Sequence, residues 1–290
     1  MTEKEKRQLS IQACKVRIGV IESIYGAKAG HPGGSLSSAD LLVYLYWKEL
    51  NIDPTRPKDT YRDRFVLSKG HCAPGLYATL AYRGFFPVED LPTLRHSDSY
   101  LQGHPNMNLV PGVDMSTGSL GQGVSAAAGM ALGAKKMGLE NVRIYTLLGD
   151  GEIEEGQVWE AFMFATHYKL DNFCVIIDNN GLQIDGAVAD VMNPYPIEDK
   201  LKAFGFEIQT VDGHNFDKLE TAFKRARTTN GRPFAIVMKT TKGKGVSFME
   251  NSVDWHGKAP NDEQYETAMK ELQAKLAELE AVCPSRLRGQ

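Results

Sequence analysis

The chain has 290 residues, a formal net charge of −3 at pH 7, and charged residues of both signs interspersed along its length. This length is sufficient to bury a substantial core in one large α/β domain or in two small ones. The charge balance offers no basic patch that could neutralise a run of phosphates, so small ligands are expected and nucleic acid is not.

The N-terminal segment, MTEKEKRQLSIQACKVR, is charged and lacks the apolar region of a signal peptide. No later stretch approaches the roughly 18 continuous apolar residues of a membrane span. The four cysteines are far apart and show no C-x-x-C spacing, at Cys14, Cys72, Cys174 and Cys283. This spacing argues against a disulfide framework and a structural zinc site, so we expect a soluble protein of the reducing cytoplasm, without a membrane partner.

Amphipathic patterns in the first fifty residues predict helices over residues 8–28 and 37–50, with Ser37 or Ser38 as a possible N-cap of the second. Segments dense in glycine, proline and histidine lie between and after these helices. They are AGHPGGS, LSKGHCAPG, LQGHPNMNLVPG and STGSLGQG. We expect them to be loops, and loops of this kind often carry function.

Short apolar runs, many of them β-branched, predict four strands later in the chain. These runs cover residues 142–148, 173–178, 206–211 and 234–240. Continuous apolar runs are typical of strands that are covered on both faces. Helical patterns at residues 156–170 and 216–229 lie between strands. The alternation predicts parallel βαβ units and an α/β fold with a doubly wound parallel sheet.

The C-terminal pattern predicts an amphipathic helix over residues 261–281 that faces solvent and could pack on a partner. We find no internal repeat and no low-complexity block along the chain. We therefore expect one domain, residues 1–290.

The segment LLGDGEIEEGQVWEA, residues 147–161, sets four carboxylates between a predicted strand and a predicted helix. Such crowding of acids indicates a cationic group nearby. The next predicted strand is followed by Asn179 and Asn180. A right-handed crossover brings the carboxyl ends of both strands to one edge of the sheet, so Asp150 and the two asparagines become neighbours. Ligands of open α/β sheets bind at that edge, and a helix that starts near Glu155 offers N–H groups to an anion.

Carboxylate and amide oxygens suit Mg²⁺ or Ca²⁺, and Mg²⁺ commonly completes its octahedron with phosphate and water oxygens. The two motifs at the ends of one βαβ unit therefore predict a metal-bridged diphosphate. Either motif alone is explained about equally well as a turn.

These residues resemble the thiamine diphosphate signature, in which Gly-Asp-Gly is followed by a later Asn-Asn: GDGEIEEGQVWEA and CVIIDNNGLQIDG. Four further motifs resemble transketolase: GHPGG, RDRFVLSKGH, GHP…PGVDMSTGSLGQG and TTKGKGVSFMEN…WHGKAP. The resemblance runs from about residue 15 to residue 260. It implies the thiamine diphosphate-binding fold, specifically its diphosphate-binding (PP) domain. It also implies the cofactors thiamine diphosphate and Mg²⁺, with Ca²⁺ or Mn²⁺ as substitutes for the metal.

The resemblance also implies the residues of the site. The metal ligands would be Asp150, Asn180 and the main-chain carbonyl of Leu182. Other contacts to the cofactor would come from His71, Gly118, Leu120, Gly151, Asn180, Ile184 and His256. The catalytic set would comprise four histidines and two acids of a relay near the dimer interface, namely His31, His71, His104, His256, Glu155 and Glu160.

Histidines suit a polyol substrate, because imidazoles can donate to hydroxyls and carbonyls and move protons near neutral pH. A lone histidine is nevertheless more often structural than catalytic. His167 and His214 match no catalytic position of the family, and we expect His167 to be structural. The role of His96 stays open.

The family's reaction transfers a two-carbon ketol unit from a ketose to an aldose, with the thiazolium as electron sink. Pentose phosphates are the family's expected sugars. In the family, a second, pyrimidine-binding domain supplies the glutamate that activates the cofactor, and no further βαβ series follows WHGKAP. We therefore expect the N-terminal subunit of a split transketolase, completed by a separate C-terminal subunit in an α2β2 heterotetramer and active only with that partner.

Several alternatives compete with this interpretation. A phosphohydrolase of the haloacid dehalogenase type needs an early D-x-D nucleophile, and none precedes Asp150. A nucleotide-binding enzyme is disfavoured, because GSLGQG lacks G-x-G-x-x-G order and TKGKGVS lacks the P-loop ending. The stronger alternatives are another split thiamine diphosphate enzyme and a non-catalytic, cofactor-binding assembly subunit, although the set of histidines favours transketolase.

Overall fold

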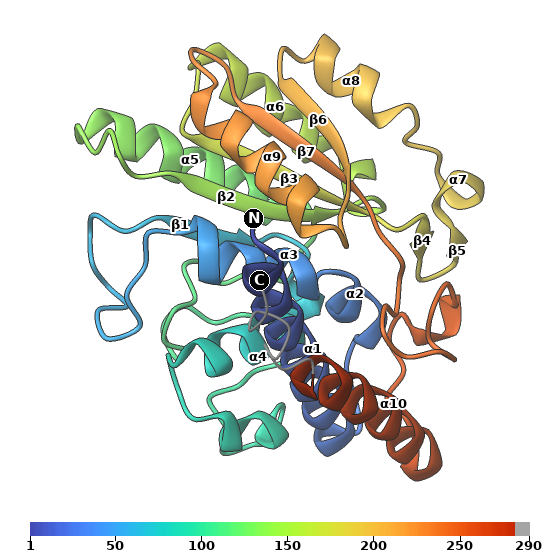
Figure 1. Cartoon of the computed structure of the whole chain (residues 1–290). Coiled ribbons are helices and arrows are strands. Elements are labelled where there is room, and N and C mark those ends of the chain that lie inside the picture. The colour runs from blue at the N-terminus through green and yellow to red at the C-terminus, as the bar shows by residue number, and fades with distance from the viewer. Residues whose placement is uncertain (282–290) are drawn as a thin grey trace, which may run out of the picture.

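A five-stranded parallel sheet forms the centre of the computed structural model, which describes residues 1–281 (Figure 1). The strand order is β1-β2-β3-β7-β6, and every neighbouring pair is parallel. The strands are β1 Arg64–Leu67, β2 Ile144–Gly149, β3 Phe173–Asn179, β6 Glu207–Asp212 and β7 Phe234–Lys239. A separate antiparallel pair comprises β4 Leu182–Gln183 and β5 Gly186–Ala187. The predicted α/β fold with a parallel sheet is confirmed.

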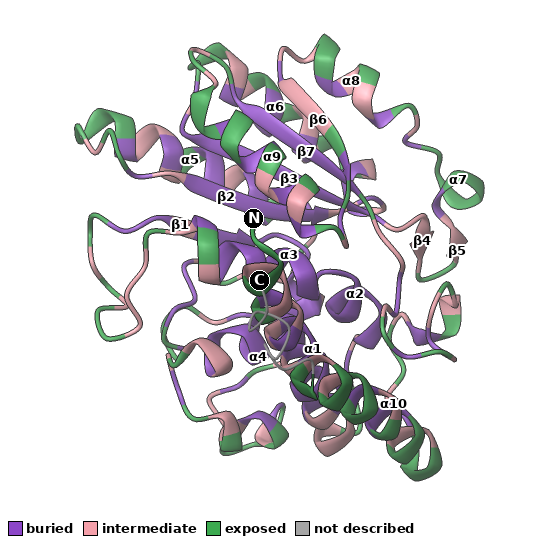
Figure 2. Cartoon of the chain, in the orientation of Figure 1, coloured by how far each residue is buried: buried purple, intermediate pink, exposed green. Residues whose placement is uncertain are grey.

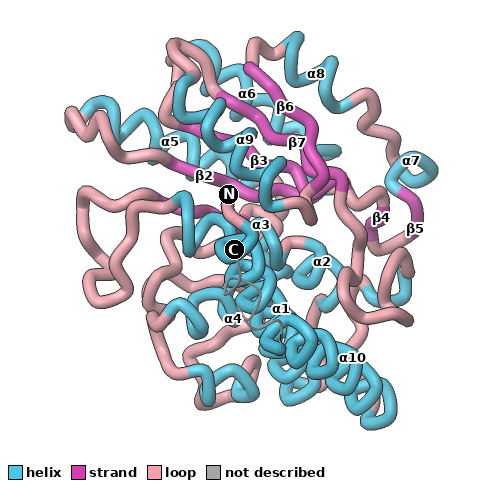
Figure 3. Tube along the Cα trace, viewed as in Figure 1, coloured by secondary structure: helices cyan, strands magenta, loops and turns pink. Residues whose placement is uncertain are grey.

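Helices cover both faces of the sheet (Figure 3). Because successive side chains of a strand point to opposite faces, Cys174 and Ile176 of β3 join one core while Val175 and Ile177 join the other. The first core lies under α3 Ala39–Tyr44 and α9 Phe216–Thr228, and the second under α5 Gln122–Lys136, α6 Gly156–His167 and α8 Ile197–Ala203. Figure 2 shows the central strands buried between these layers, which is the double cover that their apolar runs predict.

A further helical layer packs beneath the first core. It consists of α1 Glu3–Ala27, α4 Ala73–Arg83 and α10 Asp262–Ala281, and α1 contacts the other two. The helix expected near the C-terminus is thus α10, whose buried residues are Ala268, Met269 and Leu272. Its apolar side packs on α1 of the same chain. None of the helices in residues 1–281 has the length and apolar character to cross a membrane.

The helix expected at residues 37–50 is confirmed over residues 39–49, where α3 continues into a π-helical turn over Leu45–Glu49, and a separate short helix, α2 Pro32–Ser37, precedes it. Neither Ser37 nor Ser38 caps α3 with its side chain. Ser37 Oγ instead donates to Asp178 Oδ2 at 2.6 Å, and Ser38 Oγ donates to the carbonyl of Gly34 at 2.8 Å. The Ser37 hydroxyl therefore donates to the buried Asp178 carboxylate and does not cap the helix.

Three segments expected as loops contain helix starts, since α2 begins at Pro32, α4 at Ala73 and α5 at Gln122. The strand β1, four residues long, lies within RDRFVLSKGH and was not predicted. The remaining helical pieces are short: 3₁₀ turns over Gly70–Cys72, Val88–Thr93, Glu152–Glu154 and Val253–Trp255, and α7 Val188–Val191.

Candidate active site

A cavity of about 310 Å³ lies at the carboxyl ends of β2 and β3. It brings together most of the residues predicted for the site, from segments distant in the sequence. These residues are His31, His71, Gly118, Leu120, Asp150, Gly151, Asn180, Leu182, Ile184 and His256. Open α/β sheets bind ligands at this edge, so the cavity lies where the topology predicts it.

Asp150 and the Asn-Asn turn are neighbours, as predicted. The Gly181 N–H donates to Asp150 Oδ2 at 2.6 Å, and the Gly151 N–H donates to Oδ1 at 3.0 Å. Burial raises the pKa of Asp150 to about 6, and the nearby Asp178 carboxylate adds to the rise, while the two N–H groups oppose it. A buried carboxylate whose charged form is disfavoured in this way gains from a cation.

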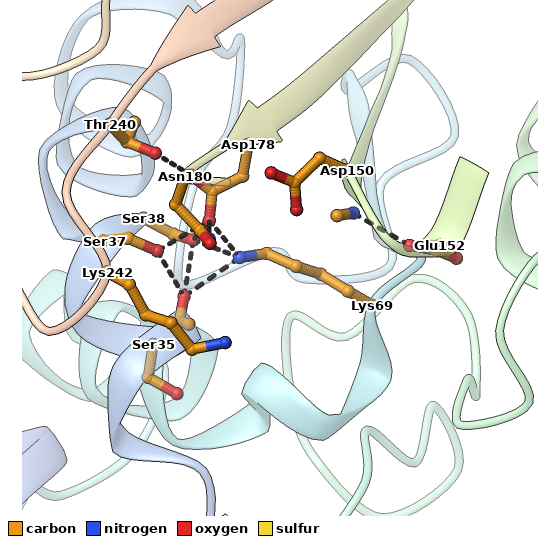
Figure 4. A network of polar contacts seen from close by, with 12 residues as sticks. Ser35, Ser37, Ser38, Lys69, Asp150, Glu152, Asp178, Asn180, Thr240 and Lys242 are labelled. Atoms are coloured by element: carbon orange, nitrogen blue, oxygen red, sulfur yellow. Dashed lines mark hydrogen bonds and ion pairs between the residues drawn. The ribbon is translucent and has the colours of Figure 1, made fainter. Parts of the chain in front are cut away.

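A buried ion pair that the sequence reasoning missed lies behind Asp150. Lys69 Nζ, at the end of β1, donates to Asp178 Oδ2 at 2.6 Å, and both side chains are almost fully buried (Figure 4). Thr240 Oγ1 donates to the other carboxylate oxygen, and Asn180 Nδ2 donates to Oδ2 at 3.3 Å. Asp178 therefore fixes Lys69 and the Asn180 amide at one side of the cavity.

A second lysine, Lys242, reaches the cavity from the segment after β7. Its Nζ donates to the carbonyl of Leu182 at 2.9 Å and lies 2.8 Å from Nδ1 of His256. Burial lowers the pKa of Lys242 to about 8. The two lysines supply the cationic groups that the crowded acids after β2 led us to expect.

Three histidines cluster in the cavity beside Lys242. The ring centroids of His31, His71 and His256 lie between 5.1 and 5.6 Å apart. Burial lowers the pKa of His31 to about 4 and of His256 to about 3, and it also lowers the pKa of His71. All three imidazoles are therefore neutral at pH 7. Nδ1 of His31 is buried and has no hydrogen-bond partner among the described residues.

The remaining predicted site residues do not line this cavity. His104 lies just behind it, since a Cβ added to Gly118 would stand 3.2 Å from the His104 ring. Glu155 is the N-cap residue of α6 and is exposed, as is Glu160 on the same helix. Glu160 lines a separate groove between α5 and α6.

Glu152, one of the four acids of the segment 147–161, is buried and structural. It accepts hydrogen bonds from Ser68 Oγ at 2.6 Å and from the N–H groups of Gly121 and Gly149 at 3.0 and 3.1 Å. It thus ties the Gly-Asp-Gly turn to the loop before α5, which carries the cavity residues Gly118 and Leu120.

The other histidines lie outside the cavity. His167 is exposed at the end of α6, and His96 is exposed with Nε2 3.5 Å from the carbonyl of Gly26. His214 is different, because both of its ring nitrogens are hydrogen bonded, Nδ1 to Asp40 and Nε2 to the Thr241 N–H.

The donor set fits a metal that also binds phosphate. Residues 1–281 contain no group of three His, Cys, Asp or Glu side chains that could hold a metal. Asp150, Asn180 and the Leu182 carbonyl would supply only part of an octahedral shell, and phosphate and water oxygens commonly supply the rest for Mg²⁺. Lys242 beside these groups offers positive charge to a diphosphate, whereas the charge of Lys69 is neutralised by Asp178.

An open α/β sheet with this cavity at its edge defines a protein that binds an anionic small ligand there. A family model described as transketolase, thiamine diphosphate binding domain, matches residues 7–279. The chain belongs to this transketolase family.

Three relatives illustrate how the chain compares in length. It is 44% identical to "6-deoxy-6-sulfo-D-fructose transketolase subunit SqwG" of Clostridium sp. (strain MSTE9), over 94% of this chain and 99% of the relative. It is 43% identical to one of the subunits of an apulose-4-phosphate transketolase of Phocaeicola vulgatus, over 94% of this chain and 96% of the relative. It is 39% identical to "Transketolase" of Homo sapiens, over 94% of this chain but only 43% of the relative.

A solved structure shows the same relation. The crystal structure of transketolase from Campylobacter jejuni subsp. jejuni NCTC 11168 matches with a TM-score of 0.86 and 32% identity, over 96% of this chain and 46% of that chain. The fold described above thus matches one part of that longer transketolase chain.

Proposed function

We propose that this chain is the N-terminal subunit of a split transketolase that uses thiamine diphosphate and Mg²⁺. The observation that carries the proposal is the cavity itself, where the Asp150 and Asn180 side chains, two lysines and three neutral histidines converge. The two bacterial relatives support a split arrangement, because each is named as one subunit of a transketolase and is matched over nearly its whole length.

In this proposal, Asp150, Asn180 and the Leu182 carbonyl bind Mg²⁺, and the Gly151 N–H and Lys242 bind the diphosphate. Gly118, Leu120 and Ile184 contact the rings of the cofactor. Gly118 suits a close approach because it has no side chain. Thiamine diphosphate, when bound, supplies the electron sink for cleavage next to a carbonyl.

The histidines serve the sugar. His31, His71, His104 and His256 donate to the hydroxyls and the carbonyl of the substrate and move the protons that its hydroxyls lose or gain. Their low pKa values keep them neutral, so each imidazole has one donor and one acceptor nitrogen. Glu155 and Glu160 contribute to the proposed relay from the exposed surface of α6, where a second copy of the chain would approach.

The proposed substrate is a ketose that carries an anionic group. The names of the two bacterial relatives give 6-deoxy-6-sulfo-D-fructose and apulose 4-phosphate, a sulfonate and a phosphate. These names point to sugars other than the usual pentose phosphates. A separate C-terminal subunit supplies the pyrimidine-binding domain, and two copies of each chain form the active assembly.

The test is to purify the polypeptide that associates with this chain and to assay each alone and both together. Ketol transfer should require both chains, thiamine diphosphate and Mg²⁺, in a panel of phosphorylated and sulfonated ketoses. Full activity from this chain alone would contradict the split arrangement. Activity of the pair only with 2-ketoacids would indicate another thiamine diphosphate enzyme.

Asp150→Ala distinguishes a catalytic role from an assembly role. The catalytic proposal expects this variant to lose both cofactor retention and activity with the partner. The matched control is Asp199→Ala, an exposed acid that pairs with Lys202, and it should retain both. If Asp150→Ala binds the partner normally and the unaltered pair has no activity, the chain serves assembly alone.

A further inference from the structure

Several hydrogen bonds hold the segment that carries Lys242 into the cavity, and two of them lead to groups bound to one buried carboxylate. Residues 240–245 follow β7, and Lys242 lies in the middle of them. The Thr241 N–H donates to Nε2 of His214 at 2.9 Å, and the carbonyl of Lys244 accepts from Nε of Arg17 at 2.9 Å. One residue on each side of Lys242, Thr241 before it and Lys244 after it, is thus anchored to a group outside the cavity.

The hydrogen bonds of His214 fix its tautomer. A main-chain N–H can only donate, so Nε2 of His214 must be an unprotonated acceptor. The ring proton is then on Nδ1, which lies 2.7 Å from Asp40 Oδ2. His214 therefore connects the carboxylate of Asp40 to the main chain of Thr241 through one neutral imidazole.

Asp40 is the common centre of both anchors. Arg17 donates to its two carboxylate oxygens at 3.2 and 2.6 Å, and both side chains are nearly buried. Burial would raise the pKa of Asp40, but Arg17 and the hydrogen bond from His214 outweigh it and lower the pKa to about 2. The carboxylate stays charged and fixes the positions of the Arg17 and His214 side chains.

We propose that His214 is a positioning residue, which places Lys242 at the Leu182 carbonyl by holding the Thr241 N–H. His214 lines no part of the cavity and touches no reacting group. Its effect on ligand binding passes through the 240–245 segment alone. This inference rests on the proposed function only where it links Lys242 to the diphosphate; the hold on Thr241 is independent of that function.

Two variants separate the two hydrogen bonds of the ring. In His214→Gln, the side-chain oxygen can occupy the position of Nε2 and still accept from Thr241, but the donor to Asp40 is lost. In His214→Asn, the amide can occupy the position of Nδ1 and donate to Asp40, but nothing accepts from Thr241. A purely structural role would respond to the two losses alike. His96→Asn, at an exposed histidine, is the control for the substitution itself.

The first measurement is amide hydrogen exchange of residues 240–245 in the full chain without cofactor. We expect exchange of the Thr241 amide to be at least about tenfold faster in His214→Asn and nearly unchanged in His214→Gln. The second is the affinity of the chain with its partner for thiamine diphosphate and Mg²⁺. It should fall about tenfold in His214→Asn, equivalent to about 1.4 kcal/mol, and much less in His214→Gln.

Equal effects of the two variants on exchange would overturn the proposal. If the unaltered pair binds no thiamine diphosphate, the proposed function fails, while the exchange result still decides the role of His214. Nitrogen-15 NMR of the histidines in the unaltered chain needs no variant. It should show His214 protonated at Nδ1 alone, and a proton on Nε2 would refute the hydrogen bond from Thr241.

Discussion

Asp178→Asn should destabilise the chain strongly, although Asp178 lies behind the predicted metal ligands. The carboxylate accepts from Lys69, Ser37, Thr240 and Asn180 and is fully buried. The substitution preserves the shape but removes the charge that neutralises Lys69. Lys69 Nζ would retain only the carbonyl of Gly34 at 2.9 Å and the hydroxyl of Ser38 at 2.7 Å.

Removal of one partner from a buried ion pair costs about 3–5 kcal/mol. The two hydrogen bonds that Lys69 retains favour the lower end, about 3 kcal/mol. The entropy of unfolding is roughly 0.6 kcal/mol/K for a chain of this length, so the midpoint of thermal unfolding should fall by roughly 5 °C.

The loss should also depend on pH. Burial would raise the pKa of Asp178, but Lys69 and several hydrogen bonds lower it below its usual value. A carboxyl with a lowered pKa in the folded state contributes stability above its unfolded pKa of about 3.9 and loses it as the pH falls through the folded pKa. The difference between Asp178→Asn and the unaltered chain should therefore be complete at pH 7 and should begin to shrink below about pH 4.

The assay is urea unfolding at pH 7 and at low pH. Asp199→Asn is the matched control, because Asp199 and Lys202 form an exposed pair with 69% and 59% of their side chains accessible. The control should change the free energy of unfolding by less than about 0.5 kcal/mol. A loss below about 1 kcal/mol for Asp178→Asn at pH 7 would refute this account of the ion pair.

Three other substitutions test the site and the helical layer. Asp150→Asn should abolish Mg²⁺ binding, yet it should stabilise the ligand-free chain at pH 7 by up to about 3 kcal/mol. The reason is that the pKa of Asp150 is raised to about 6 in the folded chain, so its charged form destabilises the fold as the pH rises through that range. Urea unfolding at pH 4 and pH 7 checks this, and an equal midpoint for variant and unaltered chain at pH 7 would contradict it. Lys242→Met should weaken thiamine diphosphate binding by the assembled pair at least about tenfold in calorimetry, whereas Lys202→Met, at an exposed lysine, should leave it unchanged. If the Lys242→Met pair and the unaltered pair bind thiamine diphosphate with the same affinity, Lys242 is not part of the site. Leu272→Ala should lower the free energy of unfolding by about 2–4 kcal/mol in chemical unfolding, since Leu272 is 2% exposed between α10 and α1. The exposed control Glu278→Ala should be nearly neutral. A small loss for Leu272→Ala would mean that α10 contributes little to stability.

The strands that the sequence predicted well are those whose apolar runs are long. β2, β3 and β7 are buried on both faces, so nearly every residue is apolar and the run is visible without any tertiary information. β1 was missed because it has only four residues and lies among charged ones, which are buried in ion pairs such as Arg62–Asp114 and Lys69–Asp178. β6 was predicted although only Val211 of it is buried, so the length of the run decides more than burial which strands a single sequence reveals.

The site was predictable where its chemistry is local. Asp150 and Asn180 follow adjacent strands, so topology alone brings them together. Lys69 and Asp178 are 109 residues apart, and their pairing depends on the order of β1, β2 and β3 in the sheet. Both lysines lie in motifs that the resemblance includes, but a lysine in a glycine-rich loop is usually solvated, so only the structure shows that Lys69 and Lys242 are buried.

The charges in the cavity explain how it suits both an anion and hydroxyl groups. Lys242 carries positive charge, whereas Asp178 neutralises Lys69, and the field of Lys242 adds to burial in keeping the imidazoles of His31 and His256 neutral. Neutral imidazoles can both donate and accept, which a polyol requires, whereas protonated ones could only donate. Lys242 thus contributes twice, because it attracts an anion and helps to hold the neighbouring histidines in the form that hydroxyl groups need. A ligand with an anionic end and a reactive ring, together with a hydroxylated substrate, matches these two kinds of group.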